Sequence, residues 1–374
     1  MPDLTYLDHA ATTPMRAEAV EAMLPFLTER FGNPSGSHRA ARDARKALDE
    51  SRERVASVLG VDSGEVVFTG DGTEADNLAI AGVHAASGGV VVCSAVEHHA
   101  VLHPVEHLGG RVVGVDATGA IDLDALARSL DDEVSVVSVM TVNNEVGTIQ
   151  PIARVAEVVA ERAPRAVLHT DAIQAFAWLD VGEVCAGAHL VSISGHKFGG
   201  PKGVGVLVVR KHVDLAPIVL GGGQERGRRS GTQNVAGIVA LATAMDLAHE
   251  ERKTMVDRVT TLRDHLVDGL VEKVGGVTET VPRDRKVAGN AHVLIDGVEA
   301  EALLFLLDRE GVCASAGSSC SSGAMEASHV LRAMGIIPDV ANGAVRFSLG
   351  PTSRPADVDR ALEVVPAAVA KLRR

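Results

Sequence analysis

Short apolar runs alternate with longer amphipathic stretches along the middle of the chain. Each apolar run is rich in Val and Ile and is bounded by Gly, Asp or Ser, which is typical of buried strands. These runs predict strands at 66–68, 90–93, 134–139, 166–169, 190–193 and 205–209. The amphipathic stretches between them predict helices that include 75–86, 123–130 and 152–161. This strand–helix alternation predicts an α/β fold with a mostly parallel sheet that is covered on both faces.

The pattern changes after Gly231. Two Ala-rich helical stretches are expected at about 235–252 and 256–274. The remaining elements are expected as a strand at 292–295, a helix at 300–309, a Gly/Ser-rich stretch at 314–323, a strand at 344–348 and a helix at 356–372. We therefore place a domain boundary near residue 252. Because no low-complexity linker separates the two units, we expect them to pack tightly.

Composition and charge narrow the class of protein. Of the 374 residues, 46% are hydrophobic and 23% are charged, which is ordinary for a globular enzyme and unlike a disordered chain. The net charge of −13 argues against general nucleic-acid binding, which requires a basic surface. The sequence has no apolar run long enough to span a membrane and no signal-peptide pattern at its start, so we expect a cytoplasmic protein.

The four cysteines, Cys93, Cys185, Cys313 and Cys320, fit neither of two common cysteine frameworks. They form no CxxC motif, and their spacings match neither a zinc site nor a secreted disulfide framework. Without further information they are expected to be reduced thiols that pack as small apolar residues.

Two polar residues at the ends of expected strands each fit two interpretations. Lys197 follows the strand at 190–193 in a Gly-rich segment. It suits either an aldimine with a pyridoxal cofactor or a solvated surface loop. Asp171 follows the strand at 166–169 and suits either a partner of a pyridinium nitrogen or a helix N-cap.

Three further polar segments follow other expected strands. Residues 69–74 suit a phosphate cradle at a helix N-terminus or an ordinary capped turn. Glu97-His98-His99 suits ring stacking and proton transfer, a partly exposed pair, or a chance metal site. Residues 143–145 follow the strand at 134–139. They suit either a contribution to a site at the strand ends or an ordinary polar turn. Because the ends of parallel strands meet at one edge of a sheet, the coincidence of these segments favours a single site.

Motifs along nearly the whole chain resemble those of the pyridoxal-phosphate-dependent cysteine desulfurases of the aminotransferase class V family. They stand at 6–14 (YLDHAATTP), 32–35 (GNPS), 69–77 (TGDGTEADN), 97–101 (EHHAV), 143–147 (NNEVG), 171–174 (DAIQ), 194–197 (SGHK), 221–226 (GGGQER), 229–232 (RSGT), 317–320 (GSSC) and 345–350 (VRFSLG). The resemblance implies fold-type I, with a large cofactor-binding domain at 12–252. A small α+β domain would comprise 1–11 and 253–374 and carry the catalytic cysteine loop.

The resemblance also implies a pyridoxal 5'-phosphate cofactor that is held covalently by Lys197. Asp171 would pair with its pyridine nitrogen, Gln174 would contact its ring hydroxyl, and His98 would stack on the ring and assist proton transfer. Its other contacts would come from Gly72, Thr73, Asn144, Ser194 and His196, with Thr73, Ser194 and His196 on the phosphate. No metal is implied. Asp71 departs from the family pattern, and its charge suits a phosphate site only if it points away.

The remaining implied roles concern substrate and partners. Arg346 would grip the carboxylate of L-cysteine, because a guanidinium matches a carboxylate bidentately, and Asn144 would orient the substrate. Cys320 would accept the sulfur as a persulfide and pass it to a protein acceptor. Thr232 would reach the phosphate of a neighbouring subunit, which implies a homodimer with shared sites.

The implied activity is the conversion of L-cysteine to L-alanine with sulfur transfer. Acceptors for such enzymes serve iron–sulfur cluster assembly, tRNA thiolation or DNA phosphorothioation. Two alternatives stay open. One is another chemistry on the same scaffold, such as an aminotransferase or a selenocysteine lyase, although an aminotransferase needs no thiol like Cys320. The other is a non-catalytic sulfur carrier, against which the pair of Lys197 and Asp171 argues.

Overall fold

A computed structural model describes residues 4–316 and 328–374 of the chain. Its strands are β1 Thr5–Tyr6, β2 Val66–Thr69, β3 Val90–Ser94, β4 Arg111–Val113, β5 Val134–Ser138, β6 Val167–Asp171, β7 Leu190–Ser194, β8 Gly205–Val209, β9 Val277–Glu279, β10 Asn290–Ile295, β11 Val312–Cys313, β12 Ser315–Ala316 and β13 Ala344–Ser348. Its α-helices are α1 Ala17–Thr28, α2 Arg39–Leu59, α3 Gly72–Ser87, α4 His99–His107, α5 Leu123–Ser129, α6 Ile152–Arg162, α7 Val181–Val184, α8 Val235–Val274, α9 Ala300–Arg309, α10 His329–Ala333, α11 Pro338–Ala341 and α12 Pro355–Leu372.

A mostly parallel sheet forms the centre of the larger part of the molecule. Its strand order is β2-β8-β7-β6-β5-β3-β4. Strand β8 runs antiparallel to β2 and β7, whereas the other neighbouring strands are parallel. The predicted α/β fold is therefore confirmed, and each predicted strand of this sheet is present. The sequence pattern missed the edge strand β4, which is only a few residues long.

Successive residues of these strands enter two different hydrophobic clusters. Val66 and Phe68 pack in a cluster that includes side chains of α2, α6 and the first half of α8, whereas Val67 packs with α3 and α4 on the opposite face. Because both faces of the sheet are covered, most positions of its strands are apolar, and most of the polar residues within them are buried as well. This is why Val-rich runs, rather than strict alternation of apolar and polar residues, marked the strands in the sequence.

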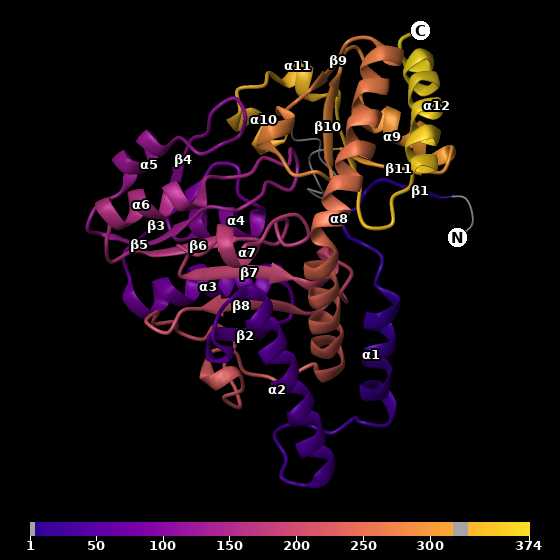
Figure 1. Cartoon of the computed structure of the whole chain (residues 1–374). Helices are drawn as coiled ribbons and strands as arrows, with labels where there is room; N and C mark the ends of the chain where they lie inside the picture. Colours follow the sequence, from indigo (N-terminus) through magenta and orange to yellow (C-terminus); the bar gives the residue numbers. More distant parts are fainter. Residues whose placement is uncertain (1–3, 317–327) are drawn as a thin grey trace.

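Helix α8 joins the central sheet to a second, smaller sheet (Figure 1). The prediction of two separate helices here is wrong, because no Gly or Pro interrupts the segment around Met255. The first half of α8 packs beside α1 and α2, and its second half packs with α9 and α12 against the antiparallel sheet β12-β13-β10-β9. One helix thus contributes to both hydrophobic cores.

The N-terminal strand β1 pairs in parallel with β11, which connects the start of the chain to the C-terminal part. The proposed domain boundary near residue 252 falls within α8, between its two packing regions. The assignment of 12–252 to one domain, and of 1–11 with 253–374 to another, stays a prediction. Within the described residues, no helix is both long and apolar enough to cross a membrane.

Candidate active site

A cavity of about 370 Å³ lies at the ends of the central strands. Its lining comes from segments that follow β2, β3, β5, β6 and β7, together with the N-terminal segment and β13. The lining residues are Ala10, Ala11, Asp71, Gly72, Thr73, Asp76, His98, Met140, Asn144, Asp171, Ile173, Gln174, Ser194, His196, Lys197 and Arg346. The structure therefore brings together the predicted site residues from strand ends that are far apart in the sequence.

Lys197 ends the short 3₁₀ turn Gly195–Lys197 that follows β7. Its Nζ donates hydrogen bonds to the carbonyl oxygens of Ala10 at 2.6 Å and Ala11 at 2.9 Å. Burial, aided by the charge of Arg346, lowers the pKa of Lys197 to about 8. A substantial fraction of this amine is therefore neutral at mildly alkaline pH, as a nucleophile requires.

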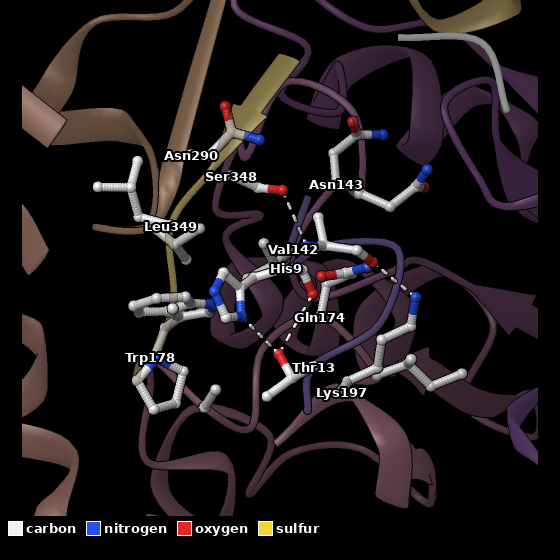
Figure 2. Close-up of a pocket in the computed structure, with 18 residues that line it drawn as sticks. His9, Thr13, Val142, Asn143, Gln174, Trp178, Lys197, Asn290, Ser348 and Leu349 are labelled. Carbon is white, nitrogen blue, oxygen red and sulfur yellow. Dashed lines mark hydrogen bonds between the residues drawn. The ribbon is translucent and has the colours of Figure 1, made fainter. Parts of the chain in front are cut away.

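The segment that positions Lys197 is itself tied to the C-terminal sheet. The Ala10 N–H donates to Ser348 Oγ at 2.9 Å, and Gln174 Nε2 donates to the Ala10 carbonyl at 2.8 Å. Behind it, His9 Nδ1 lies 3.1 Å from Thr13 Oγ1, beside a second pocket of about 20 Å³ (Figure 2). The segment whose Ala10 and Ala11 carbonyls accept hydrogen bonds from Lys197 is thus held in place by hydrogen bonds to Ser348 and Gln174.

Asp171 is the last residue of β6, at the floor of the cavity. One carboxylate oxygen accepts the Ile173 N–H at 2.8 Å. Burial raises the pKa of Asp171 to about 6, while the nearby charge of Lys197 opposes that rise. The side chain faces the cavity as an acceptor, and does not cap a helix. This geometry suits a partner for a protonated ring nitrogen.

The N-terminus of α3 and the end of β7 form a polar corner that suits a phosphate. Gly72 is the first residue of α3, and a Cβ there would lie 2.2 Å from Ile173 Cδ1, so a larger residue would fill the corner. Ser194 Oγ is buried without a hydrogen-bond partner among the described residues. An unpaired hydroxyl beside a helix N-terminus is the arrangement that an anionic group would complete.

Three other predicted residues complete this part of the cavity wall. His196 Nδ1 lies 3.1 Å from Thr12 Oγ1, and burial lowers the pKa of His196 to about 4. Thr73 lies in the first turn of α3. The Asp71 carboxylate caps α3 by accepting the Glu74 N–H at 2.7 Å, which gives it a use away from any phosphate.

His98 is the N-cap of α4 and lines the cavity. Its Nδ1 accepts the Ala100 N–H at 3.1 Å. Burial, reinforced by the charge of Lys197, lowers the pKa of His98 to about 4. The imidazole is therefore neutral near neutral pH with its proton on Nε2, because Nδ1 is already an acceptor. A neutral ring with one fixed N–H suits stacking and proton exchange.

Arg346 on β13 brings a cation into the cavity from the smaller sheet. One terminal nitrogen donates to Asp8 Oδ1 at 3.0 Å, and the other donates to the Asn144 carbonyl at 2.7 Å. Its buried Nε has no hydrogen-bond partner among the described residues. The guanidinium is thus held by two partners that use two of its five N–H groups, and a planar guanidinium matches a carboxylate bidentately.

Two predicted residues do not join the cavity in the structure. Thr232 lies on the exposed surface and is absent from the cavity lining of the described chain. Cys320 falls at 317–327, outside the described residues. Cys93 and Cys185 are buried, as the packing interpretation predicts, and Cys313 is partly exposed.

Sequence reasoning missed the contributions of the N-terminal segment to the site. Asp8 and the carbonyls of Ala10 and Ala11 stand in the quoted motif at 6–14, but nothing in their local pattern indicates that they contact Arg346 and Lys197. Asp76 was also missed, because a carboxylate within an expected helix gives no signal of burial.

Comparisons with family models, curated proteins and solved structures all point to the same family. The model of the family described as aminotransferase class-V matches residues 5–361. An IscS-like cysteine desulfurase of Mycobacterium tuberculosis is 45% identical, over 99% of this chain and 98% of its own. A solved NifS-like protein shares 34% identity with a TM-score of 0.92, covering 98% of this chain and 100% of its own. SspA, solved in complex with cysteine, shares 30% identity with a TM-score of 0.81, covering 93% and 99%.

The geometry of the cavity agrees with the cofactor that this family uses. The polar corner at α3, the buried acceptor Asp171 and the desolvated amine of Lys197 fit the phosphate, the ring nitrogen and the aldehyde of pyridoxal phosphate. The chain belongs to the aminotransferase class-V family and, within it, to the pyridoxal-phosphate-dependent cysteine desulfurases.

Proposed function

We propose that this chain converts L-cysteine to L-alanine and passes the sulfur through a persulfide on Cys320 to a protein acceptor. The observation that carries the proposal is the pairing, in one cavity, of the partly neutral Lys197 amine with the Arg346 guanidinium. Together they provide a reactive amine and a carboxylate anchor for a small amino acid. That a related structure was solved with cysteine supports this choice of substrate.

Pyridoxal phosphate, when bound, withdraws electrons from the bonds at the substrate's α-carbon and thereby makes the sulfur labile. Lys197 would hold the cofactor and, once released by the substrate, carry protons to and from the α-carbon. Its hydrogen bonds to the Ala10 and Ala11 carbonyls give the freed amine a defined place. His98, with its proton on Nε2, would stack on the ring and supply a second proton donor.

Substrate orientation would fall to Arg346 and Asn144. Asp8 and the Asn144 carbonyl fix the guanidinium, so little conformational freedom is lost when a carboxylate binds it. The carboxylate of L-cysteine would therefore be held on the β13 side of the cavity. This leaves its amino group toward Lys197.

The sulfur transfer would be a displacement at the substrate sulfur by the Cys320 thiolate. A sulfur–sulfur bond forms, the carbon–sulfur bond of the substrate breaks, and a proton takes the place of sulfur on the β-carbon. One L-cysteine and one enzyme thiol thus give one L-alanine and one persulfide. A thiol of an acceptor protein would then take the terminal sulfur, for iron–sulfur cluster assembly or tRNA thiolation.

The test is incubation of the purified holoenzyme with L-cysteine and a thiol reductant. We expect alanine and sulfide in equal amounts, without any keto acid. Keto acid formed in place of alanine would indicate an aminotransferase. A protein that carries persulfide supplied from outside, but forms no alanine, would indicate a sulfur carrier.

We also propose that the chain works as a homodimer with shared sites. Leu24, Leu27 and Phe31, on and just after α1, are all more than half exposed, and Leu220 is 80% exposed. Exposed apolar groups of this size typically mark protein contacts. The Ser230 N–H donates to the Val219 carbonyl, which ties the loop bearing Leu220 to the one bearing Thr232. A partner seated on Leu220 would therefore meet Thr232.

Sedimentation at micromolar concentration should show a species of about twice the 38.9 kDa chain mass. Leu220→Asp should weaken this dimer because it places an unpaired charge in the contact. Val112→Asp, at a half-exposed apolar position on the edge strand β4, serves as the control. A monomeric wild-type protein with full activity would contradict the shared site.

A further inference from the structure

Asp76 on α3 has a buried carboxyl group. None of the roles described above involves it. Its side chain is fully buried and lines the same cavity as Asp171. Neither of its oxygens has a hydrogen-bond partner among the described residues. Leaving a buried polar group unpaired is destabilising, so such a group in a native site calls for a functional explanation.

No cation compensates a negative charge on Asp76. In the described part of the chain, the basic nitrogen within 4 Å of its oxygens is His169 Nε2, at 3.5 Å. The ring nitrogens of His169 already engage Ser138 Oγ at 2.8 Å and Ser192 Oγ at 2.9 Å. Burial lowers the pKa of His169 to about 3, so this imidazole is neutral and offers no positive charge.

The groups around Asp76 also favour its protonated form. Burial, and next the charge of Asp171, raise the pKa of Asp76 well above its usual range, and the facing Ser192 hydroxyl opposes this less strongly. Further acidic groups that face it are Asp71 and Glu97, and the pKa of Glu97 is itself raised by burial. The other titratable groups on the cavity wall are His98, His196, Lys197 and Arg346.

Asp171 differs from Asp76 in having a backbone donor. The Ile173 N–H is bonded to its carboxylate, and the charge of Lys197 favours its ionised form. When two carboxyls share a low-dielectric site, one ionises and the other keeps the proton. The hydrogen bonding therefore assigns the charge to Asp171 and the proton to Asp76.

We propose that Asp76 stays protonated, and therefore neutral, in the working enzyme, which leaves Asp171 as the charged carboxylate of the cofactor cavity. Asp76 is thus a positioning residue that acts through Asp171. An added negative charge beside Asp171 would destabilise the charge that holds the ring nitrogen, whereas a neutral carboxyl does not. The inference rests on the family's cofactor and on the role proposed for Asp171.

The test is Asp76→Asn, which keeps the shape and the neutrality of a protonated carboxyl and has no proton to lose. We expect its cofactor dissociation constant to lie within about threefold of the wild-type value. The pH titration of the bound cofactor's absorbance should give the same apparent pKa in wild type and Asp76→Asn.

An absorbance pKa that moves by about one unit or more in Asp76→Asn would show that Asp76 carries charge and would overturn the proposal. Thermal unfolding of the cofactor-free full chain shows whether Asp76→Asn folds as the wild type does. Infrared spectra of the two holoenzymes give a second measurement: a protonated-carboxyl band present in wild type should be absent from Asp76→Asn, and identical spectra would refute the assignment. A wild-type chain that binds no cofactor would instead contradict the proposed function.

Discussion

Replacing Lys197 by alanine is expected to lower the rate of alanine formation from L-cysteine by a factor on the order of 10³ or more. Lys197 is the one lysine in the described cavity lining, and burial has lowered its pKa to about 8. Alanine removes both the proposed attachment point for the cofactor and the proposed base that moves protons at the α-carbon. It also leaves the carbonyls of Ala10 and Ala11 facing the cavity without their donor.

The measurement is alanine release, together with borohydride reduction to detect covalently held cofactor. Lys202→Ala is the matched control, because Lys202 lies in the same Gly-rich segment but is exposed and outside the cavity lining. This control should keep wild-type activity and a reducible cofactor. Substantial turnover in Lys197→Ala, with the control unchanged, would show that another amine performs both tasks.

Replacing Cys320 by alanine should leave cofactor binding intact and reduce sulfur transfer by a factor on the order of 10³ or more, as expected when a nucleophile is removed. The residues that fit the cofactor all come from the ends of the central strands, the start of α3 and the N-cap of α4. Cys320 is not one of these residues, so its replacement removes the proposed sulfur acceptor and leaves them unchanged. Mass spectrometry after exposure to L-cysteine should find a persulfide on the wild-type protein and none on the variant.

Cys313→Ala is the matched control, because Cys313 is the partly exposed cysteine among the described residues. It should form persulfide on Cys320 as the wild type does. Persulfide formation and normal alanine release in Cys320→Ala would rule out the assigned acceptor. Adding candidate acceptor proteins to the loaded wild type would then identify which one takes the sulfur.

The sequence by itself determined the local elements of the central sheet. Because β2, β3, β5, β6, β7 and β8 are buried on both faces, most of their residues are apolar, and short Val-rich runs bounded by turn residues reveal them. It also indicated that the polar residues at the strand ends meet, since parallel strands end at one edge. The chemistry of Lys197, Asp171 and Arg346 followed from motifs that are contiguous in the chain.

Only the tertiary structure decided what depends on contacts between distant segments. The continuity of α8 follows from its packing in two cores, and a local pattern does not distinguish one long helix from two short ones. Asp8 and Arg346 are hundreds of residues apart, yet they form an ion pair at the wall of the cavity, and this pair fixes the guanidinium that we propose as the substrate anchor. Asp76 looks like any helix carboxylate in the sequence, and burial without a partner gives it a different protonation state. Solvation and hydrogen bonding set the charge of such groups, and both are properties of the folded chain.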